Sequence, residues 1–430
     1  MNKAAAFVLV LSAALLASPW RGHIDDVDAQ LYQCLARSMA ERHAWLDPGL
    51  PPGSPAPYRE HLPFGFWPYV AAVRVAGEGA LRPVGALFAL LTVALVISMG
   101  WRLQSPSAGV AAGLVLAVTE TFFLYGGRPR LDPPLMLFAT AAAWPALRSQ
   151  PRLRDWTLAA GLAAIAALIK GPFGLVPLAS AAAARAIVDR SWRHLLSGAL
   201  ATLAAAAPAA AFLFLSDPSW WTGYVRSQLV ASATGARPDG YISHWGAVRS
   251  VAARFWPGLP FAVLACLRRD RPRLLMLWCA LLLLALSVPL RTWWNHELVA
   301  YPALALLAGA WLGPWFEKVK PAWFAALAGV GVAASAAGLG AHLLLPPCVA
   351  SSEMKQYFDA IPPGTKMQIV SWPYDYRINT AIAAERRLAV SLEGELRDDG
   401  HWALAQEQLV PRETKWREVA RARGYVLLSR

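Results

Sequence analysis

Apolar runs of about 20 residues, separated by short polar loops, fill the first 345 residues of the chain. A helix of about 20 apolar residues is long enough to cross the ~30 Å hydrocarbon core of a bilayer. The pattern therefore predicts a mostly α-helical, polytopic membrane protein with about 11 transmembrane helices. The expected spans are 4–20, 82–100, 107–125, 133–148, 156–170, 172–188, 194–215, 250–267, 273–290, 297–315 and 321–345.

Two apolar segments need a separate interpretation. Residues 4–20 resemble a secretory signal peptide, but Pro19 and Trp20 stand where a cleavage site requires small residues, so we expect an uncleaved first span. Residues 62–77 are apolar but short and bounded by proline. We expect them to lie on or dip into the outer leaflet, because a crossing there would put every later loop on the wrong side.

Basic residues orient the spans. With the N-terminus in the cytoplasm, Arg and Lys concentrate in the short cytoplasmic loops, as the positive-inside rule requires. These residues are Arg102; Arg148, Arg152 and Arg154; Arg185, Arg190 and Arg193; Arg268, Arg269, Arg271 and Arg273; and Lys318 and Lys320. The outer side then receives 21–81, 126–132, 216–249, 291–296 and everything after 345. Its aromatic residues suit a membrane interface: Trp220, Trp221, Tyr224, Trp293 and Trp294.

Composition supports this interpretation. Of the 430 residues, 57% are hydrophobic and only 16% are charged, well below the roughly 25% charge of soluble domains. The net charge of +13 is spread over short loops, so it is an orientation signal and not a nucleic-acid surface. The four cysteines have no metal-binding spacing. Cys34 and Cys348 fall on the same expected side, which would permit a disulfide, although unpaired thiols are favoured.

The composition becomes polar after Pro346 and Pro347. Strand-like segments occur at 366–372 and 425–429, and helix-like segments occur at 353–361 and 377–387. We therefore predict a small α/β domain on the outer face over residues 346–430. Residues 1–345 would form the transmembrane catalytic domain, with its acidic motif in the first outer loop, 21–81.

Three aspartates at the end of the first span are the first candidate site. Asp25, Asp26 and Asp28 lie at an expected membrane boundary, where carboxylates are rare unless they function. On a helix that starts near Asp28, Tyr32 shares its face, and Arg37 follows. The alternative is a helix N-terminus that carries acidic residues because of its dipole.

Further charged groups fall on the same expected side. Tyr58 and His61 are the first and last residues of a charged tetrad that precedes residues 62–77, the dipping segment. Lys170 ends an apolar run, and the alternative explanation for it is that its side chain snorkels to the membrane interface. In the R-P-R-L-D segment, a simple Arg–Asp salt bridge is the alternative to phosphate binding. The remaining candidates are Arg128, Arg130 and Asp132 in that segment, and Arg291, His296 and Glu297 at the mouth of the last spans. Together these groups suit a site that holds a lipid phosphate while a carboxylate deprotonates an acceptor.

The same motifs resemble those of GT-C membrane glycosyltransferases, specifically the family of lipid A aminoarabinose transferases and protein O-mannosyltransferases. That family has D-E-x-x-Y-x-x-x-A-R-x-M and then Y-x-x-K-P-P-L-x-x-W in its first outer loop. The matching residues here are Asp28, Tyr32, Ala36, Arg37 and Met39, and then Tyr58, Pro63 and Trp67, with Ala29 in place of the glutamate and His61 in place of the lysine. The segments RPRLDPPLMLF, LIKGPFGLVPL and NHELVAYPALALLAG resemble later family motifs in the same order.

The resemblance implies an inverting glycosyltransferase of the bacterial inner membrane that moves a sugar from a polyprenyl-phosphate carrier to a periplasmic acceptor. It implies that Asp28 is the general base, with Asp25 and Asp26 as substitutes. Arg128, Arg130, Lys170 and His61 would bind the lipid phosphate. The sugar and the acceptor (lipid A, another glycan or a protein) stay open. A divalent cation is conceivable beside three carboxylates, although no ligand spacing demands one.

Two other function classes stay open. A lipid or solute transporter or flippase would also need charges among spans, although transporters place them near the bilayer midplane. A glycan polymerase or ligase would share the scaffold. Substrate-dependent release of polyprenyl phosphate separates glycosyl transfer from transport.

Overall fold

The structure is a computed structural model. It describes residues 3–17, 27–49, 58–148, 150–236, 241–268, 270, 272–292, 296–318, 361–362, 365–370, 389–393, 401–406, 410–411, 415–422 and 425–430. The chain divides into two compact units. The first unit comprises Met1–Pro19, Arg59–Gly65 and Arg82–Leu339, and the second comprises Trp20–Tyr58, Phe66–Leu81 and Gly340–Arg430.

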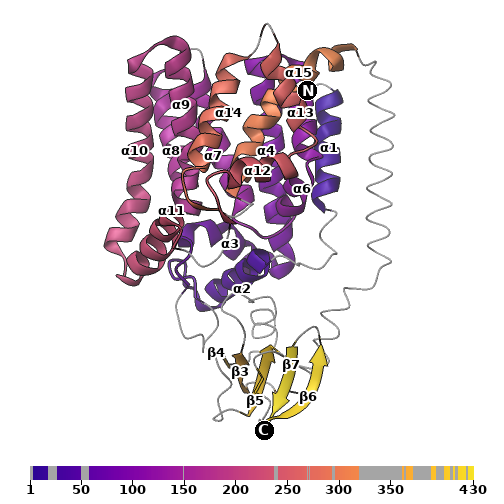
Figure 1. The fold of residues 1–430 in the computed structure, drawn as a ribbon, viewed down its shortest axis with the longest axis vertical. Helices are drawn as coiled ribbons and strands as arrows, with labels where there is room; N and C mark the ends of the chain where they lie inside the picture. The colour runs from indigo at the N-terminus through magenta and orange to yellow at the C-terminus, as the bar shows by residue number, and fades with distance from the viewer. Residues whose placement is uncertain are drawn as a thin grey trace. The chain divides into compact units, whose positions relative to one another are not determined.

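The first unit is a helical bundle (Figure 1). Its long helices are α1 (Lys3–Ala17), α4 (Leu81–Leu103), α5 (Pro106–Ala117), α7 (Asp132–Leu147), α8 (Leu153–Lys170), α9 (Val176–Asp189), α10 (Trp192–Leu215), α14 (Arg273–Leu286) and α15 (Tyr301–Lys318). Its shorter helices are α6 (Glu120–Gly126), a π-helix (Trp221–Val230), α11 (Ala231–Thr234), α12 (Gly246–Arg254), α13 (Leu259–Leu267) and the 3-10 helices Gly171–Gly174 and His296–Ala300. Strands β1 (Tyr241–Ile242) and β2 (Arg291–Thr292) pair antiparallel. Helix α15 packs against α5 and α13, α8 against α7 and α10, and α9 against α14.

The helices make the chain a multi-pass membrane protein. Among the described residues, four helical segments are long and apolar enough to cross a bilayer: Leu81–Leu103, Leu153–Gly174, Trp192–Leu215 and His296–Lys318. Two bent helix pairs raise this number to six if each pair is one span. Helices α1 and α14 are apolar but shorter. The eleventh expected span, 321–345, lies outside the described residues.

Two spans that we expected to be continuous are broken instead. The run 107–125 forms α5 and α6 with a bend of 71°, and the run 250–267 forms α12 and α13 with a bend of 107°. Pro257 and Gly258 explain the second bend, because proline removes a helical donor and glycine weakens the helix. The two bends are packed together: a Cβ added at Gly258 would lie 2.6 Å from the Val115 side chain of α5.

Residues 62–77 form no continuous span. They fold into a 3-10 helix (Pro63–Phe66) and α3 (Trp67–Ala76). The ten residues of α3 cover about 15 Å, roughly half of a bilayer core. This length fits the expected segment that lies on or dips into one leaflet. Gly65 packs closely on Leu131 and Ile169, where a Cβ would lie 3.0 Å from the Leu131 side chain.

The second unit contains helix α2 (Val27–Arg42), α3, the 3-10 helix Glu78–Ala80 and a five-stranded sheet. The strands are β3 (Lys366–Val370), β4 (Ala389–Glu393), β5 (Trp402–Gln406), β6 (Arg417–Ala422) and β7 (Tyr425–Ser429). Their order is β4-β3-β5-β7-β6, with parallel pairing among the first three and antiparallel pairing among the last three. Strands β3 and β7 match the expected strand segments, whereas the other three were not expected. The segment 377–387 and most of 353–361 lie outside the described residues.

Candidate active site

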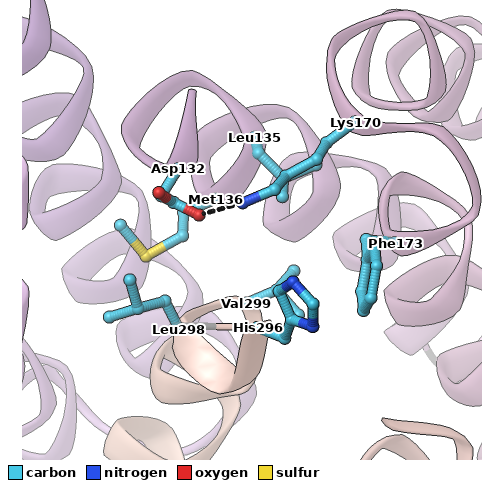
Figure 2. Close-up of a pocket in the computed structure, with 8 residues that line it drawn as sticks. All are labelled: Asp132, Leu135, Met136, Lys170, Phe173, His296, Leu298 and Val299. Atoms are coloured by element: carbon cyan, nitrogen blue, oxygen red, sulfur yellow. Dashed lines mark hydrogen bonds and ion pairs between the residues drawn. The ribbon is translucent and has the colours of Figure 1, made fainter. Parts of the chain in front are cut away.

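Asp132 of the first unit is held by two cations. Arg130 Nε lies 2.8 Å from Asp132 Oδ2. Lys170 Nζ lies 2.7 Å from Asp132 Oδ1 (Figure 2). All three side chains are buried, with at most 6% of any of them exposed. The simple Arg–Asp salt bridge that the sequence left open is therefore present, and Lys170 joins it.

Local sequence positions both partners of the Lys170–Asp132 pair. Asp132 begins α7, where Pro133 and Pro134 suit a first turn that needs no amide donors. An acidic residue there is favoured by the helix dipole, and a basic residue is favoured at a C-terminus, where Lys170 ends α8. Gly171 then adopts a φ of 59°, which glycine tolerates best.

Tyr224 of the π-helix covers Gly171. A Cβ at this glycine would collide with the Tyr224 hydroxyl. Burial raises the pKa of the Tyr224 phenol far above its usual range, so this side chain stays neutral. π-helices are rare, and most of those observed are single-turn bulges, which often occur at functional sites. No sequence signal identified this segment as a π-helix.

Among the described residues, the cluster brings two cations to one carboxylate. Arg128 lies nearby, with its guanidinium carbon 5.6 Å from the centre of the Tyr125 ring. The guanidinium carbon of Arg130 lies 4.4 Å from the centre of the same ring. Arginine and lysine side chains gathered in this way are donors suited to an anionic ligand such as a phosphate.

A small pocket opens on this cluster. Asp132 and Lys170 line it together with Phe173 and His296, and the rings of Phe173 and His296 are 4.6 Å apart (Figure 2). Apolar side chains complete the wall: Leu135, Met136, Leu298 and Val299. The structure thus brings together four expected site residues from different parts of the sequence: Arg130, Asp132, Lys170 and His296.

Glu297 is also buried, but it points to another partner. Ser250 of α12 donates a hydrogen bond to Glu297 Oε1. The positive charge of Arg254, at the end of α12, also acts on Glu297. Neither Ser250 nor Arg254 was expected from the sequence, because each is one polar residue in an otherwise ordinary helix. Arg291 lies in β2 and donates to the carbonyl of Gly235, 3.2 Å away.

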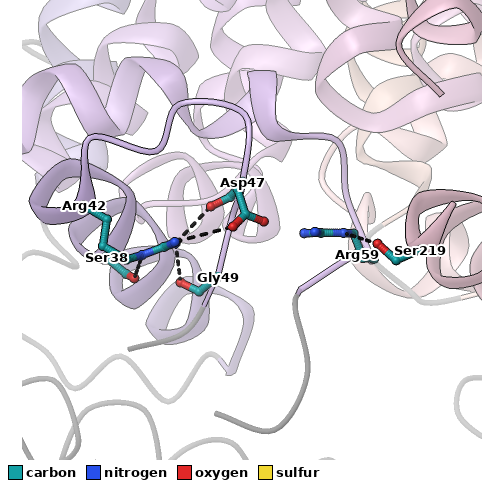
Figure 3. Close-up of polar contacts among 6 residues, drawn as sticks. All are labelled: Ser38, Arg42, Asp47, Gly49, Arg59 and Ser219. Carbon is teal, nitrogen blue, oxygen red and sulfur yellow. Dashed lines mark hydrogen bonds and ion pairs between the residues drawn. The ribbon is translucent and has the colours of Figure 1, made fainter. Parts of the chain in front are cut away.

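Arg59 anchors the chain just before residues 62–77. Its Nε donates to Ser219 Oγ over 3.1 Å, and its guanidinium lies 4.5 Å from the centre of the Trp220 ring (Figure 3). Gly223 accommodates the Arg59 side chain, because an added Cβ would meet it. The sequence placed Arg59 in a charged tetrad but did not identify it as a positioning residue. His61, two residues further on, is half-buried.

In the second unit, Asp28 lies in the first turn of α2 and is half-buried. Tyr32 and Tyr58 are buried and contact the Phe66 ring edge-on, with ring centres 5.5 Å and 6.1 Å from it. Arg37 is half-buried on the same helix. Asp25 and Asp26 lie outside the described residues.

Arg42 closes the C-terminal end of α2. It donates to the carbonyls of Asp47 and Gly49 over 2.9 Å and 3.3 Å, and to Ser38 Oγ over 3.1 Å (Figure 3). These bonds hold the turn that follows the helix. Among the residues that the structure describes, no group of three or more His, Cys, Asp or Glu side chains is arranged to hold a metal ion.

Comparisons with known proteins agree with this architecture. Residues 60–221 match the family model of dolichyl-phosphate-mannose-protein mannosyltransferases. The structure is similar to that of ArnT from Cupriavidus metallidurans bound to undecaprenyl phosphate, with a TM-score of 0.76 and 16% identity over 99% of this chain and 97% of that one. The apo state of the same ArnT gives a TM-score of 0.73 at 16% identity, with the same coverage.

The fold is also similar to that of a more distant enzyme. The Archaeoglobus fulgidus oligosaccharyltransferase in complex with Zn and sulfate gives a TM-score of 0.56 and 17% identity over 89% of this chain and 62% of that one. Comparison with curated protein sequences gave no match. These relatives are GT-C glycosyltransferases, so the expected resemblance is confirmed for the fold.

Proposed function

We propose that this chain transfers a sugar from a polyprenyl-phosphate carrier to a lipid, glycan or protein acceptor at the outer face of the membrane. The observation that carries the proposal is the buried Arg130–Asp132–Lys170 cluster in a GT-C fold, of which Asp132 and Lys170 line a pocket. The ArnT structure with undecaprenyl phosphate supports a polyprenyl-phosphate carrier, because that fold covers nearly the whole chain.

The cations would stabilise the leaving phosphate. An ammonium has three donors, and one of those on Lys170 is used by Asp132. Asp132 would orient Lys170 and Arg130, while the donors of these two cations meet the phosphate oxygens as the glycosidic bond breaks. Arg128 and His61 would add to this field. Phosphate binding by these residues is part of the proposal.

The proposed chemistry is an inverting displacement. A carboxylate removes the proton of the acceptor, whose oxygen forms a bond to the anomeric carbon. The bond from that carbon to the phosphate oxygen breaks, and the polyprenyl phosphate leaves with the electron pair. Asp28 is the proposed base. Asp25 and Asp26 are the alternatives.

The proposed topology follows the positive-inside rule. The N-terminus would lie in the cytoplasm, and loop 21–81 and the domain 346–430 would face the periplasm of a bacterial inner membrane. The proposed catalytic domain is 1–345. Cysteine labelling of intact cells tests the orientation, with Ser54→Cys and Lys318→Cys each introduced into a variant whose four native cysteines are replaced by serine. In that background, only Ser54→Cys should react.

Lys170→Met tests the function. Membranes that contain the variant should release polyprenyl phosphate from a radiolabelled polyprenyl-phosphate sugar about 10²–10³-fold more slowly, as in other sites that lose one charge-stabilising donor. Lys318→Met is the matched control, because Lys318 ends α15 and is exposed. Full release activity in Lys170→Met membranes would refute the proposal.

Transport is the second candidate, and the two broken helix pairs favour it. Discontinuous helices are typical of transporter binding sites. A transporter would move labelled substrate into sealed vesicles without releasing polyprenyl phosphate. The release assay therefore separates the two functions.

A further inference from the structure

A second cavity lies where the two broken spans meet. It has a volume of about 370 Å³ and lies between α6 and the end of α12. Glu120, Thr121 and Tyr125 line it from α6, and Arg254 and Trp256 line it from the other side. We name it the bend cavity. It shares no lining residue with the Asp132 pocket.

The bends explain why polar groups lie here. Backbone that leaves the helical path at membrane depth is tolerated where it lines a cavity or is buried in protein. Both spans break beside this cavity, by 71° and 107°. The ionisable residues Glu120 and Arg254 stand next to these breaks, and ionisable groups within spans usually serve a function.

The lining selects against most ligand classes. The Glu120 carboxylate would repel a phosphate, and the Arg254 guanidinium would repel a metal ion. Arg254 also interacts electrostatically with Glu297. A lipid tail would gain nothing from two charged side chains and two hydroxyl groups.

A neutral ring with several hydroxyl groups fits all of these constraints. Its hydroxyls can donate to Glu120, accept from Arg254 and do either with Thr121 and Tyr125. The rings of Tyr125 and Trp256 offer apolar surface beside these polar groups. The volume lies in the roughly 300–1,000 Å³ range of small-molecule sites.

We propose that the bend cavity is a sugar-binding subsite, separate from the phosphate-binding cluster at Asp132. The inference rests on the proposed function, because the sugar would belong to the acceptor or to the donor. Tyr125 links the two sites: it lines the bend cavity while its ring lies under the Arg130 guanidinium. A sugar bound here would thus contact a side chain that also touches the cation cluster.

Photolabelling tests the subsite directly. The full chain is placed in nanodiscs without glycolipid and is labelled with an octyl β-glucoside that carries a diazirine on the alkyl carbon next to the sugar. Octanol and octyl phosphate with the same diazirine serve as comparison probes. The glucoside should label peptides from 120–126 and 250–258 more strongly than either comparison probe, and excess octyl glucoside should remove the label.

Variants sharpen the test. Glu120→Gln and Arg254→Gln should each reduce this labelling about tenfold, as expected for the loss of one charge-assisted hydrogen bond. Arg249→Gln is the matched control, because Arg249 is exposed on the same helix and lies outside the cavity. Size-exclusion profiles show whether each variant stays folded. Equal loss in Arg249→Gln would overturn the proposal.

The comparison probes decide between the other occupants. Equal labelling by octanol would show a lipid-tail groove, and stronger labelling by octyl phosphate would show an anion site; either result overturns the subsite. With the subsite established, displacement by a polyprenyl-phosphate sugar but not by polyprenyl phosphate assigns it to the donor, and no displacement assigns it to the acceptor. Labelling is independent of the release assay with Lys170→Met, so failure of the subsite and failure of the proposed function are distinguishable.

Discussion

Lys170 Nζ and Asp132 Oδ1 lie 2.7 Å apart although 38 residues separate them in the chain. The pair joins the C-terminal end of α8 to the N-terminal end of α7, so each charge also meets the helix dipole that favours it. Arg130 contacts the second oxygen of the same carboxylate. Asp132 therefore balances two buried cations at once.

This arrangement predicts a large stability loss for Asp132→Asn. The substitution removes the carboxylate that pairs with both Arg130 and Lys170, and breaking a buried ion pair in this way costs about 3–5 kcal/mol. The double variant Asp132→Asn with Lys170→Met should lose less than the sum of the single variants, because the two residues are coupled. Thermal unfolding in detergent measures these differences.

Asp270→Asn is the control for that experiment. Asp270 pairs with Arg268 at 2.7 Å, but its side chain is 71% exposed. Surface pairs contribute roughly 0–1 kcal/mol, so this variant should unfold close to the parent. If the Asp132→Asn and Asp270→Asn proteins were equally stable, the buried pair would contribute nothing measurable to the stability of the fold.

The sequence predicts that these charged side chains lie on one side of the membrane, but it does not predict which of them are in contact. The segment R-P-R-L-D contains the Arg130–Asp132 pair within three residues, so a local salt bridge could be expected there. The contact of Lys170 with Asp132 depends on how α7 packs against α8, and nothing local encodes that packing. The contacts of Arg59 and Ser250 could not be predicted for the same reason, because their partners lie 160 and 47 residues away in the sequence.

Among the described residues, the helices formed by the apolar runs lie close to their predicted positions, but two of the runs are not continuous helices. Pro257 and Gly258 are helix-breaking residues, so the bend between α12 and α13 could be predicted from the sequence. The bend between α5 and α6 occurs at Val118 and Thr119, which are compatible with a continuous helix. The bend therefore depends on tertiary contacts, such as the close approach of Gly258, just before α13, to Val115 near the end of α5.

Asp28→Asn tests the proposed catalytic base. A general base contributes about 10²–10⁴-fold to rate, so transfer to acceptor in membranes should fall by that factor. Glu41→Gln is the matched control, because Glu41 is an exposed carboxylate on the same helix. Full transfer by Asp28→Asn would move the role to Asp25 or Asp26, and each of these is then tested in the same way.

Arg59→Ala should loosen the dipping segment. The variant loses the hydrogen bond to Ser219 and the contact with the Trp220 ring, which together are expected to lower the free energy of unfolding by about 1–3 kcal/mol. Arg59→Lys should recover part of this loss, since an ammonium still interacts with the ring. Arg226→Ala changes an exposed arginine of the neighbouring π-helix and should have little effect. Equal stability of the Arg59 and Arg226 variants in thermal unfolding would contradict the prediction.

Gly171→Ala isolates the contact between Gly171 and Tyr224. Alanine at a φ of 59° and a ψ of −137° costs about 1–3 kcal/mol from the backbone alone, and its Cβ would also collide with the Tyr224 hydroxyl. Tyr224→Phe removes the colliding oxygen, so the double variant should be more stable than Gly171→Ala, although still less stable than the parent. Gly161→Ala in α8, the helix that precedes Gly171, is the control: a Cβ there meets no atom within 4 Å, and the change should stabilise the helix by about 0.5–1 kcal/mol. If adding Tyr224→Phe to Gly171→Ala restores no stability to chemical unfolding, the backbone conformation alone accounts for the loss. The Tyr224 hydroxyl would then make no close contact with the turn that follows Lys170.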